Sequence, residues 1–210
     1  MPLFVINLKA YAEGTGKNAE RFAKSAEKIG MKNLIVAAQP CDLFRLSKFK
    51  ISLFSQYVDP VEYGAKTGHL PPKLAKECGA KGTLLNHSEN RIPMEDIEKC
   101  ISLCKEAGLK TIVCVENVEE AKKVDRMKPN YIAIEPKDLI GSGIPVSKAE
   151  PELVIKAVNA VKTPVLCGAG INSRDDFLAS EKLGTKGVLV ASAMVKAKNQ
   201  EKALRELVGK

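Results

Sequence analysis

The sequence contains no tryptophan and few other aromatic residues, only six phenylalanines and four tyrosines. The net charge of +8 raises the question of nucleic acid, but the lysines alternate with glutamates, as in AERFAKSAEK (19–28) and NVEEAKKVD (117–125). A nucleic-acid site usually combines a basic block with aromatic side chains on which bases stack. We therefore expect no nucleic-acid partner. The lysines are interpreted as solvated helix faces, whose mild positive field would help to collect a small anion.

Long hydrophobic runs are also missing. None approaches the roughly 18 apolar residues that a membrane-spanning helix needs. The N-terminal stretch MPLFVINLKAY lacks the basic region and long apolar region of a signal peptide. These absences predict a cytoplasmic protein without a membrane partner.

The six cysteines include no CxxC pair. Cys114 and Cys167 lie in apolar, strand-like runs, and Cys78, Cys100 and Cys104 lie in helix-like segments. Cys100 and Cys104 share one helical face, but the two further ligands of a metal site are missing nearby. We expect buried free thiols and no metal.

Eight short apolar runs recur along the chain, rich in Val and Ile and almost free of charge. They lie at residues 3–8, 33–38, 51–56, 82–87, 110–115, 130–135, 163–168 and 187–192. Continuous apolar runs of this length are typical of parallel strands that are covered on both faces.

Segments with helical spacing separate most of these runs, and several end in glycine. Examples of these helical segments are residues 18–30, 94–108, 148–161 and 175–184, and all of them except 148–161 end in glycine. Eight strand–helix units without a linker predict a single α/β domain, a (β/α)8 TIM barrel with trimmed helices over residues 1–210. A doubly wound open sheet is the main alternative. That fold usually carries GxGxxG after its first strand, where this chain has NLKAYAEG.

Polar residues gather at the expected strand ends, which is where such barrels place their chemistry. They are Asn7 and Lys9 on one face of strand one, His87, Ser88 and Glu89 after strand four, and Glu135 after strand six. A glycine-rich turn, GAGIN (168–172), follows strand seven, and Ala191 and Ser192 follow strand eight, where backbone N–H groups commonly hold a phosphate. A carboxylate base, an imidazole, a cation and a phosphate site suit proton transfer beside the carbonyl of a phosphosugar.

Six motifs resemble the triosephosphate isomerase family in its short archaeal form. They are NLK (7–9), TGH (67–69), NHSE (86–89), IAIEPKDLIGSGIPVSKAEPE (132–152), LCGAGI (166–171) and GVLVASAMVKA (187–197). The resemblance covers essentially the whole chain. It implies interconversion of dihydroxyacetone phosphate and D-glyceraldehyde 3-phosphate in glycolysis and gluconeogenesis, without a cofactor.

The resemblance also implies individual roles. Glu135 would be the base, His87 would polarise the carbonyl as a neutral imidazole, Lys9 would neutralise developing charge, and Asn7 would hold an oxygen of the intermediate. The pairing of a glutamate base with a neutral histidine is a property of the family. The phosphate would be bound by Asn7, Lys9, Ile140, Gly141, Gly170, Ala191 and Ser192. Residues 136–138 would form a hinge and 139–143 a lid over the substrate.

In the family, a long loop reaches into the active site of a neighbouring subunit. Here it is EYGAKTGHLPP (62–72), and Thr67 matches the intruding threonine. We therefore expect a homo-oligomer, either a dimer or a tetramer, with Ser88 and Glu89 in supporting positions. Asn90, Glu116 and Tyr57 depart from the usual family pattern. Asn90 replaces a charged partner, so the ion pairs near it should differ.

Two other functions fit part of the pattern. A different phosphosugar enzyme, such as an epimerase or an amino-sugar ketol isomerase, would share strands seven and eight but not the NLK, NHSE and EPKDLIGSG combination. A non-catalytic phosphosugar-binding barrel would keep the phosphate site but lose the acid, base or cation.

Overall fold

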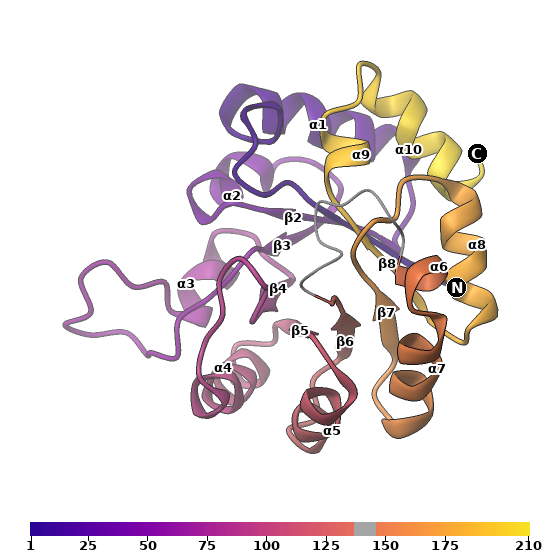
Figure 1. The fold of residues 1–210 in the computed structure, drawn as a ribbon. Coiled ribbons are helices and arrows are strands. Elements are labelled where there is room, and N and C mark those ends of the chain that lie inside the picture. Colours follow the sequence, from indigo (N-terminus) through magenta and orange to yellow (C-terminus); the bar gives the residue numbers. More distant parts are fainter. Residues whose placement is uncertain (137–145) are drawn as a thin grey trace.

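Eight parallel strands close into a barrel in sequence order, with helices around the outside (Figure 1). The computed structural model describes residues 1–136 and 146–210. The strands are β1 (Leu3–Asn7), β2 (Leu34–Ala38), β3 (Ser52–Ser55), β4 (Gly82–Leu85), β5 (Lys110–Val115), β6 (Tyr131–Ile134), β7 (Val165–Cys167) and β8 (Gly187–Val190). The barrel closes where β1 pairs with β8, with Phe4 opposite Val188 and Ile6 opposite Val190. The predicted barrel and all eight strands are confirmed.

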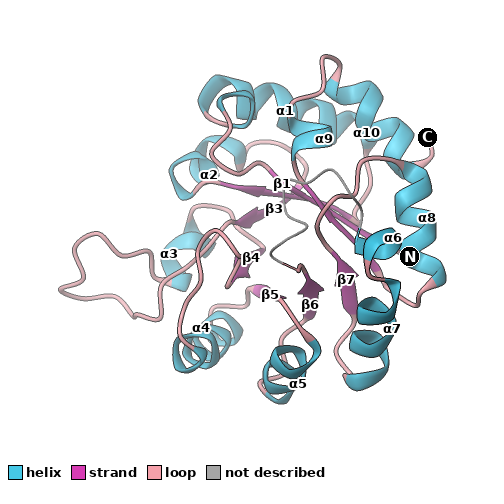
Figure 2. Ribbon diagram, in the orientation of Figure 1, coloured by secondary structure: helices cyan, strands magenta, loops and turns pink. Residues whose placement is uncertain are grey.

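The helices follow the strands around the barrel (Figure 2). They are η1 (Ala12–Gly14), α1 (Gly16–Ile29), α2 (Pro40–Leu46), α3 (Pro72–Glu77), α4 (Met94–Glu106), α5 (Val118–Arg126), α6 (Val146–Ala149), α7 (Pro151–Ala160), α8 (Arg174–Lys182), α9 (Ser192–Val195) and α10 (Gln200–Val208). Across 1–136 and 146–210, no helix is both long and apolar enough to cross a membrane.

Strand side chains alternate between two hydrophobic layers, which explains why the runs read as continuously apolar. Val5, Ile112 and Leu166 belong to the layer inside the barrel. Phe4 and Ile6 belong to the layer between the sheet and the helices. Both layers exclude water, so neither face of a strand needs polar residues.

The segment 148–161 was expected to be one helix, and this expectation is wrong. The chain forms the short α6 and then α7, which begins at Pro151. Glu150 between them has φ −135° and ψ 57°. A residue before proline is disfavoured in the helical region, so the break follows from the sequence Glu150–Pro151.

Candidate functional site

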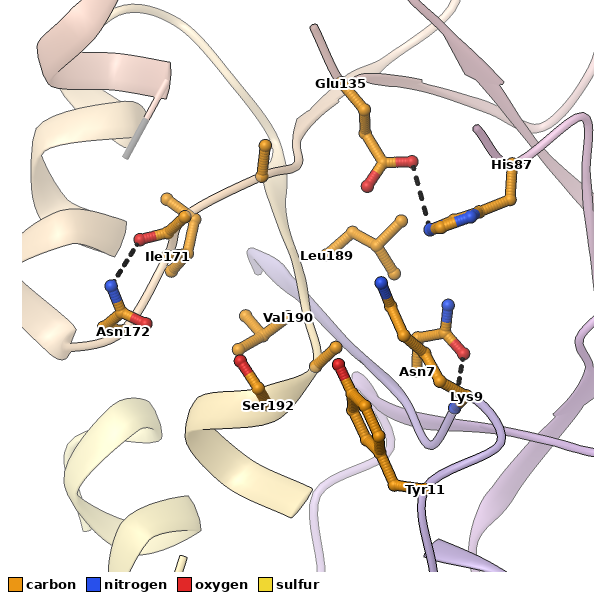
Figure 3. Close-up of a pocket in the computed structure, with 13 residues that line it drawn as sticks. Asn7, Lys9, Tyr11, His87, Glu135, Ile171, Asn172, Leu189, Val190 and Ser192 are labelled. Atoms are coloured by element: carbon orange, nitrogen blue, oxygen red, sulfur yellow. Dashed lines mark hydrogen bonds and ion pairs between the residues drawn. The ribbon is translucent and has the colours of Figure 1, made fainter. Parts of the chain in front are cut away.

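A cavity of about 110 Å³ opens at the ends of the strands (Figure 3). It is lined by Asn7, Lys9, Tyr11, His87, Glu135, Ala169, Gly170, Ile171, Asn172, Leu189, Val190, Ala191 and Ser192. An adjoining cavity of about 280 Å³ shares Asn7, Lys9 and His87 and extends toward Gln56 and Glu89. The structure thus brings together seven of the residues singled out in the sequence, although they come from five different strand ends.

Glu135 lies one residue beyond β6, and its side chain points into the cavity toward His87 (Figure 3). Its backbone N–H donates to the Val115 carbonyl over 2.8 Å, which continues the sheet to this residue. The residue is only 4% exposed. Its Oε2 atom receives no hydrogen bond from any of the described residues. A buried carboxylate oxygen without a partner is costly, so it marks a place where a ligand is expected.

Two buried cysteines flank Glu135 on the neighbouring strands. On β5, burial and the nearby negative charge of Glu135 raise the pKa of Cys114 well above its usual value. On β7, burial raises the pKa of Cys167 to about 12. Both thiols are therefore protonated at neutral pH. The predicted burial is confirmed for these two cysteines, whereas Cys41 is exposed and Cys78 is half-buried.

His87 follows β4, and its orientation is set by the backbone beyond it. The Glu89 N–H donates to Nδ1 over 3.1 Å, so a neutral imidazole carries its proton on Nε2. Nε2 lies 3.8 Å from Glu135 Oε2, too far for a direct hydrogen bond. The two groups therefore face each other across the cavity. The other histidine, His69, is exposed in the segment between β3 and α3.

Lys9 does not lie on a strand, so its predicted placement on one strand face with Asn7 is wrong. It follows β1 with φ 48°, in the left-handed region that lysine rarely adopts. Its N–H donates to Asn7 Oδ1 over 3.0 Å, and its carbonyl accepts from Gln56 Nε2 over 3.0 Å. This conformation turns the side chain into the cavity, where Nζ lies 2.6 Å from Glu89 Oε1. Non-glycine residues in unusual backbone conformations are concentrated at functional sites.

The opposite end of the cavity is made of backbone. Ala169 (φ 63°) and Gly170 (φ 69°) are consecutive left-handed residues in the turn after β7. After β8, Ala191 is the N-cap of α9 and Ser192 is its first residue. The first N–H groups of a helix have no partner within it, so they point outward and suit an anion. We call Asn7, Lys9, His87 and Glu135 the side-chain end of the cavity, and Ala169, Gly170, Ala191 and Ser192 its backbone end.

Other predicted residues lie elsewhere. Ile140 and Gly141, with the lid over 139–143 and the hinge residues Lys137 and Asp138, lie outside the described residues. Ser88 and Glu89 follow His87, and Glu89 lines the adjoining cavity. Thr67 lies in an exposed segment and does not line either cavity of its own chain.

Sequence reasoning missed Tyr11, Leu189 and Gly168. Tyr11 lines the cavity, and its ring lies 4.1 Å from Lys196 Nζ. Gly168 lies against the side chain of Glu135, because a Cβ placed there would come within 2.3 Å of Glu135 Cγ. Only Gly168 had a signal in the sequence, because it belongs to the GAGIN turn. That turn was interpreted as a phosphate site, and the space that Gly168 leaves for Glu135 was not predicted.

Comparison with known proteins gives a consistent result. A model of the family "Triosephosphate isomerase" matches residues 2–208. A triosephosphate isomerase from Methanocaldococcus jannaschii is 47% identical, with 98% of each chain covered. One from Methanothermus fervidus is 46% identical over 99% of this chain and 97% of the relative.

The chain belongs to the triosephosphate isomerase family. It is therefore an enzyme of the isomerase class. A crystal structure of triosephosphate isomerase from Bartonella henselae superposes with a TM-score of 0.73, covering 100% of this chain and 99% of that one. At 21% identity this likeness supports the fold alone, and it agrees with the closed eight-stranded barrel.

Proposed function

We propose that the chain interconverts dihydroxyacetone phosphate and D-glyceraldehyde 3-phosphate through an enediolate, with Glu135 as the base. The observation that carries the proposal is the buried Glu135 carboxylate, whose Oε2 lacks a partner among the described residues and faces His87 Nε2 across the cavity. The family membership supports the same reaction.

The reaction moves one proton between two adjacent carbons and one between their oxygens, and it leaves the oxidation state of the molecule unchanged. Glu135 removes a proton from the carbon beside the carbonyl, and the electron pair forms the double bond of the enediolate while charge grows on the carbonyl oxygen. The Nε2–H of His87 donates to that oxygen. Glu135 then returns a proton to the neighbouring carbon. The former carbonyl oxygen keeps the proton from His87, and the original hydroxyl oxygen gives its proton to His87 and becomes the new carbonyl. A positioned acid and base typically contribute roughly 10²–10⁴-fold to the rate of such a step.

In the proposal, Lys9 and the backbone end of the cavity stabilise the negative charges of the enediolate and the phosphate. The Lys9 ammonium is anchored beside the cavity by its backbone contacts and would stabilise the negative enediolate and phosphate. The N–H groups around Gly170 and Ser192 would bind the phosphate. Fixed donors of this kind need no reorganisation as charge develops, so they favour the transition state.

An assay coupled to glyceraldehyde 3-phosphate oxidation tests the proposed reaction. Purified protein with a chelator should convert dihydroxyacetone phosphate at a rate proportional to protein concentration, with NAD⁺ added only as the oxidant for the coupling dehydrogenase. The absence of turnover in protein that circular dichroism shows to be folded would contradict the proposal. Binding of the substrate without turnover would favour a phosphosugar-binding barrel, and turnover of other phosphosugars alone would favour a different isomerase or an epimerase.

We also propose that the protein is a homo-oligomer, a dimer or a tetramer, assembled through the segment between β3 and α3. Residues 62–69 are all exposed, and this segment projects from the barrel (Figure 1). Tyr63 within it is 51% exposed, so its ring is available for contact with a second copy of the chain. In this arrangement Thr67 enters the partner's cavity region. Sedimentation at micromolar concentration should give a multiple of the 22.7 kDa chain mass, and a monomer mass would contradict it.

A cytoplasmic location suits this reaction and is part of the proposal. Cell fractionation of the source organism should recover the protein and its activity in the fraction without membranes, and recovery with membranes would contradict this location.

A further inference from the structure

Asn86 holds the backbone turn that presents His87 to the cavity. It directly precedes His87, is 3% exposed and has φ 58°, a region in which asparagine is among the few tolerated side chains. Its amide makes three contacts. Nδ2 donates to the Cys114 carbonyl over 2.9 Å and to Glu120 Oε1 over 3.2 Å, and Oδ1 accepts from the Ile92 N–H over 3.2 Å. The turn is thus tied both to β5 and to the far end of its own loop.

Glu120 on α5 is the centre of this arrangement. Its carboxylate accepts from Asn86, from Arg91 Nη2, and from the Glu116 N–H over 2.8 Å. Sequence spacing predicted a solvated helix face here, but Glu120 is only 9% exposed and lies on the same face as Ala121 and Val124. A buried carboxylate persists only when it is paired and hydrogen-bonded, so Glu120 and its donors depend on one another.

The loop that carries His87 is therefore held at both ends by one carboxylate. Asn86 lies at its start and Arg91 near its end, and both bind Glu120 Oε1. The Cys114 carbonyl, which accepts from Asn86, belongs to β5, and β5 pairs with β6, the strand that leads to Glu135. Asn86 thus connects the loop that carries His87 to β5, the strand beside the one that leads to Glu135.

We propose that Glu120, which does not line the cavity, is a positioning residue for His87 and acts through Asn86. This inference rests on the proposed function, because it assigns Glu120 a part in the same reaction. Without the charge of Glu120, Arg91 would lose its ion pair and the hydrogen bond from Asn86 would weaken. The turn at Asn86 would then shift, and His87 Nε2 would move relative to the substrate oxygen. Misplacement of a catalytic group lowers kcat, whereas phosphate binding at the distant backbone end is unaffected.

The test is Glu120→Gln, with Glu119→Gln as the matched control. Glu119 is the adjacent residue, is exposed, and pairs only with Lys122 among the contacts described for it. We expect kcat of Glu120→Gln to fall about tenfold. KM and the inhibition constant of inorganic phosphate should change less than about twofold, as should every parameter of Glu119→Gln.

A general structural role would lower the fraction of active protein and leave kcat per folded molecule unchanged. The inference is therefore overturned if folded Glu120→Gln, quantified by active-site titration or by its thermal transition, retains the kcat of Glu119→Gln. It is also overturned if kcat and phosphate inhibition change together. If wild-type protein itself has no isomerase activity, the proposed function fails first, so the two failures are distinguishable.

Asn86→Gly provides the second variant in case Glu120→Gln does not fold. Glycine adopts positive φ freely but lacks the amide that binds Glu120 and Cys114. A fall in kcat of about tenfold at unchanged KM supports the inference, and an unchanged kcat overturns it.

Discussion

The two ends of the cavity differ in the groups that line them: side chains at one end and backbone N–H groups at the other. The side-chain end uses buried or half-buried side chains that hydrogen bonds hold in place: the Gln56 amide donates to the Lys9 carbonyl, and the Glu89 N–H donates to His87 Nδ1. The backbone end uses turns after β7 and β8, with left-handed residues at Ala169 and Gly170. We therefore expect substitutions at the side-chain end to change kcat, and substitutions at the backbone end to change the affinity for the anion.

The largest expected effect is at the side-chain end. Glu135→Asp shortens the base by one methylene and displaces its carboxylate by roughly 1 Å, which should lower kcat on the order of 10²-fold. The fold should be unchanged, because β6 is anchored by residues before position 135. Steady-state kinetics with circular dichroism check this, and Glu119→Asp is the control. Full activity in Glu135→Asp would mean that another group is the base.

A smaller effect should follow from Gly168→Ala, which fills the space beside the base. The new Cβ would lie 2.7 Å from Glu135 Oε1 and closer still to Cγ, so the carboxylate must shift. We expect kcat to fall about tenfold or more, with a smaller change in phosphate inhibition. Kinetics with inorganic phosphate as a competitor check this. Wild-type kcat would show that the glutamate does not need its observed position.

At the backbone end, Gly170→Ala should act on affinity. Alanine at φ 69° costs about 1–2 kcal/mol, so the turn should shift and KM should rise about tenfold while kcat changes less. Ala169→Gly is the matched control, since glycine accepts φ 63° without strain and should leave KM unchanged. If Gly170→Ala lowered kcat and left KM unchanged, the division between the two ends would be wrong.

The smallest expected effect on kcat is that of alkylating the cysteine thiols. The raised pKa of Cys114 keeps it protonated, so an alkylating agent should not react with it at pH 8, and its reactivity should rise only at far higher pH. The exposed Cys41 should react first. We expect mass spectrometry to find Cys41 modified with kcat unchanged, and Cys41→Ser to abolish that modification. Rapid alkylation of Cys114 with loss of activity would show that the side-chain end is more open than its burial indicates.

The sequence predicted the architecture well because each strand is covered on both faces. Runs such as 187–192 therefore carry almost no polar interruption, and the parallel barrel could be inferred from them. Helix boundaries were less certain, as the break at Glu150–Pro151 shows. Residues such as Glu135 and His87 could be found because they follow buried strands, and the structure places both in one cavity.

Other features had no signal in the residue types. Nothing about a lysine indicates φ 48°, which depends on the amides that hold the backbone of Lys9. Glu120 looks like any glutamate of a charged helix, and its burial depends on Arg91 and Asn86 from another loop. The departure at Asn90 predicted a different local network of ion pairs, and this stays a prediction. In the structure Arg91 pairs with Glu120 and lies 3.9 Å from Glu116.

The central claim is that Glu135 moves a proton between adjacent carbons of the substrate. The most direct test is to convert dihydroxyacetone phosphate in D₂O and to follow the product by proton NMR. A carboxylate that removes a proton and returns one should introduce solvent deuterium at the carbon it reprotonates, and Glu135→Asp should slow this incorporation along with turnover. Complete conversion without any deuterium in the product, at a rate that Glu135→Asp leaves unchanged, would indicate a direct hydride shift and would contradict the account.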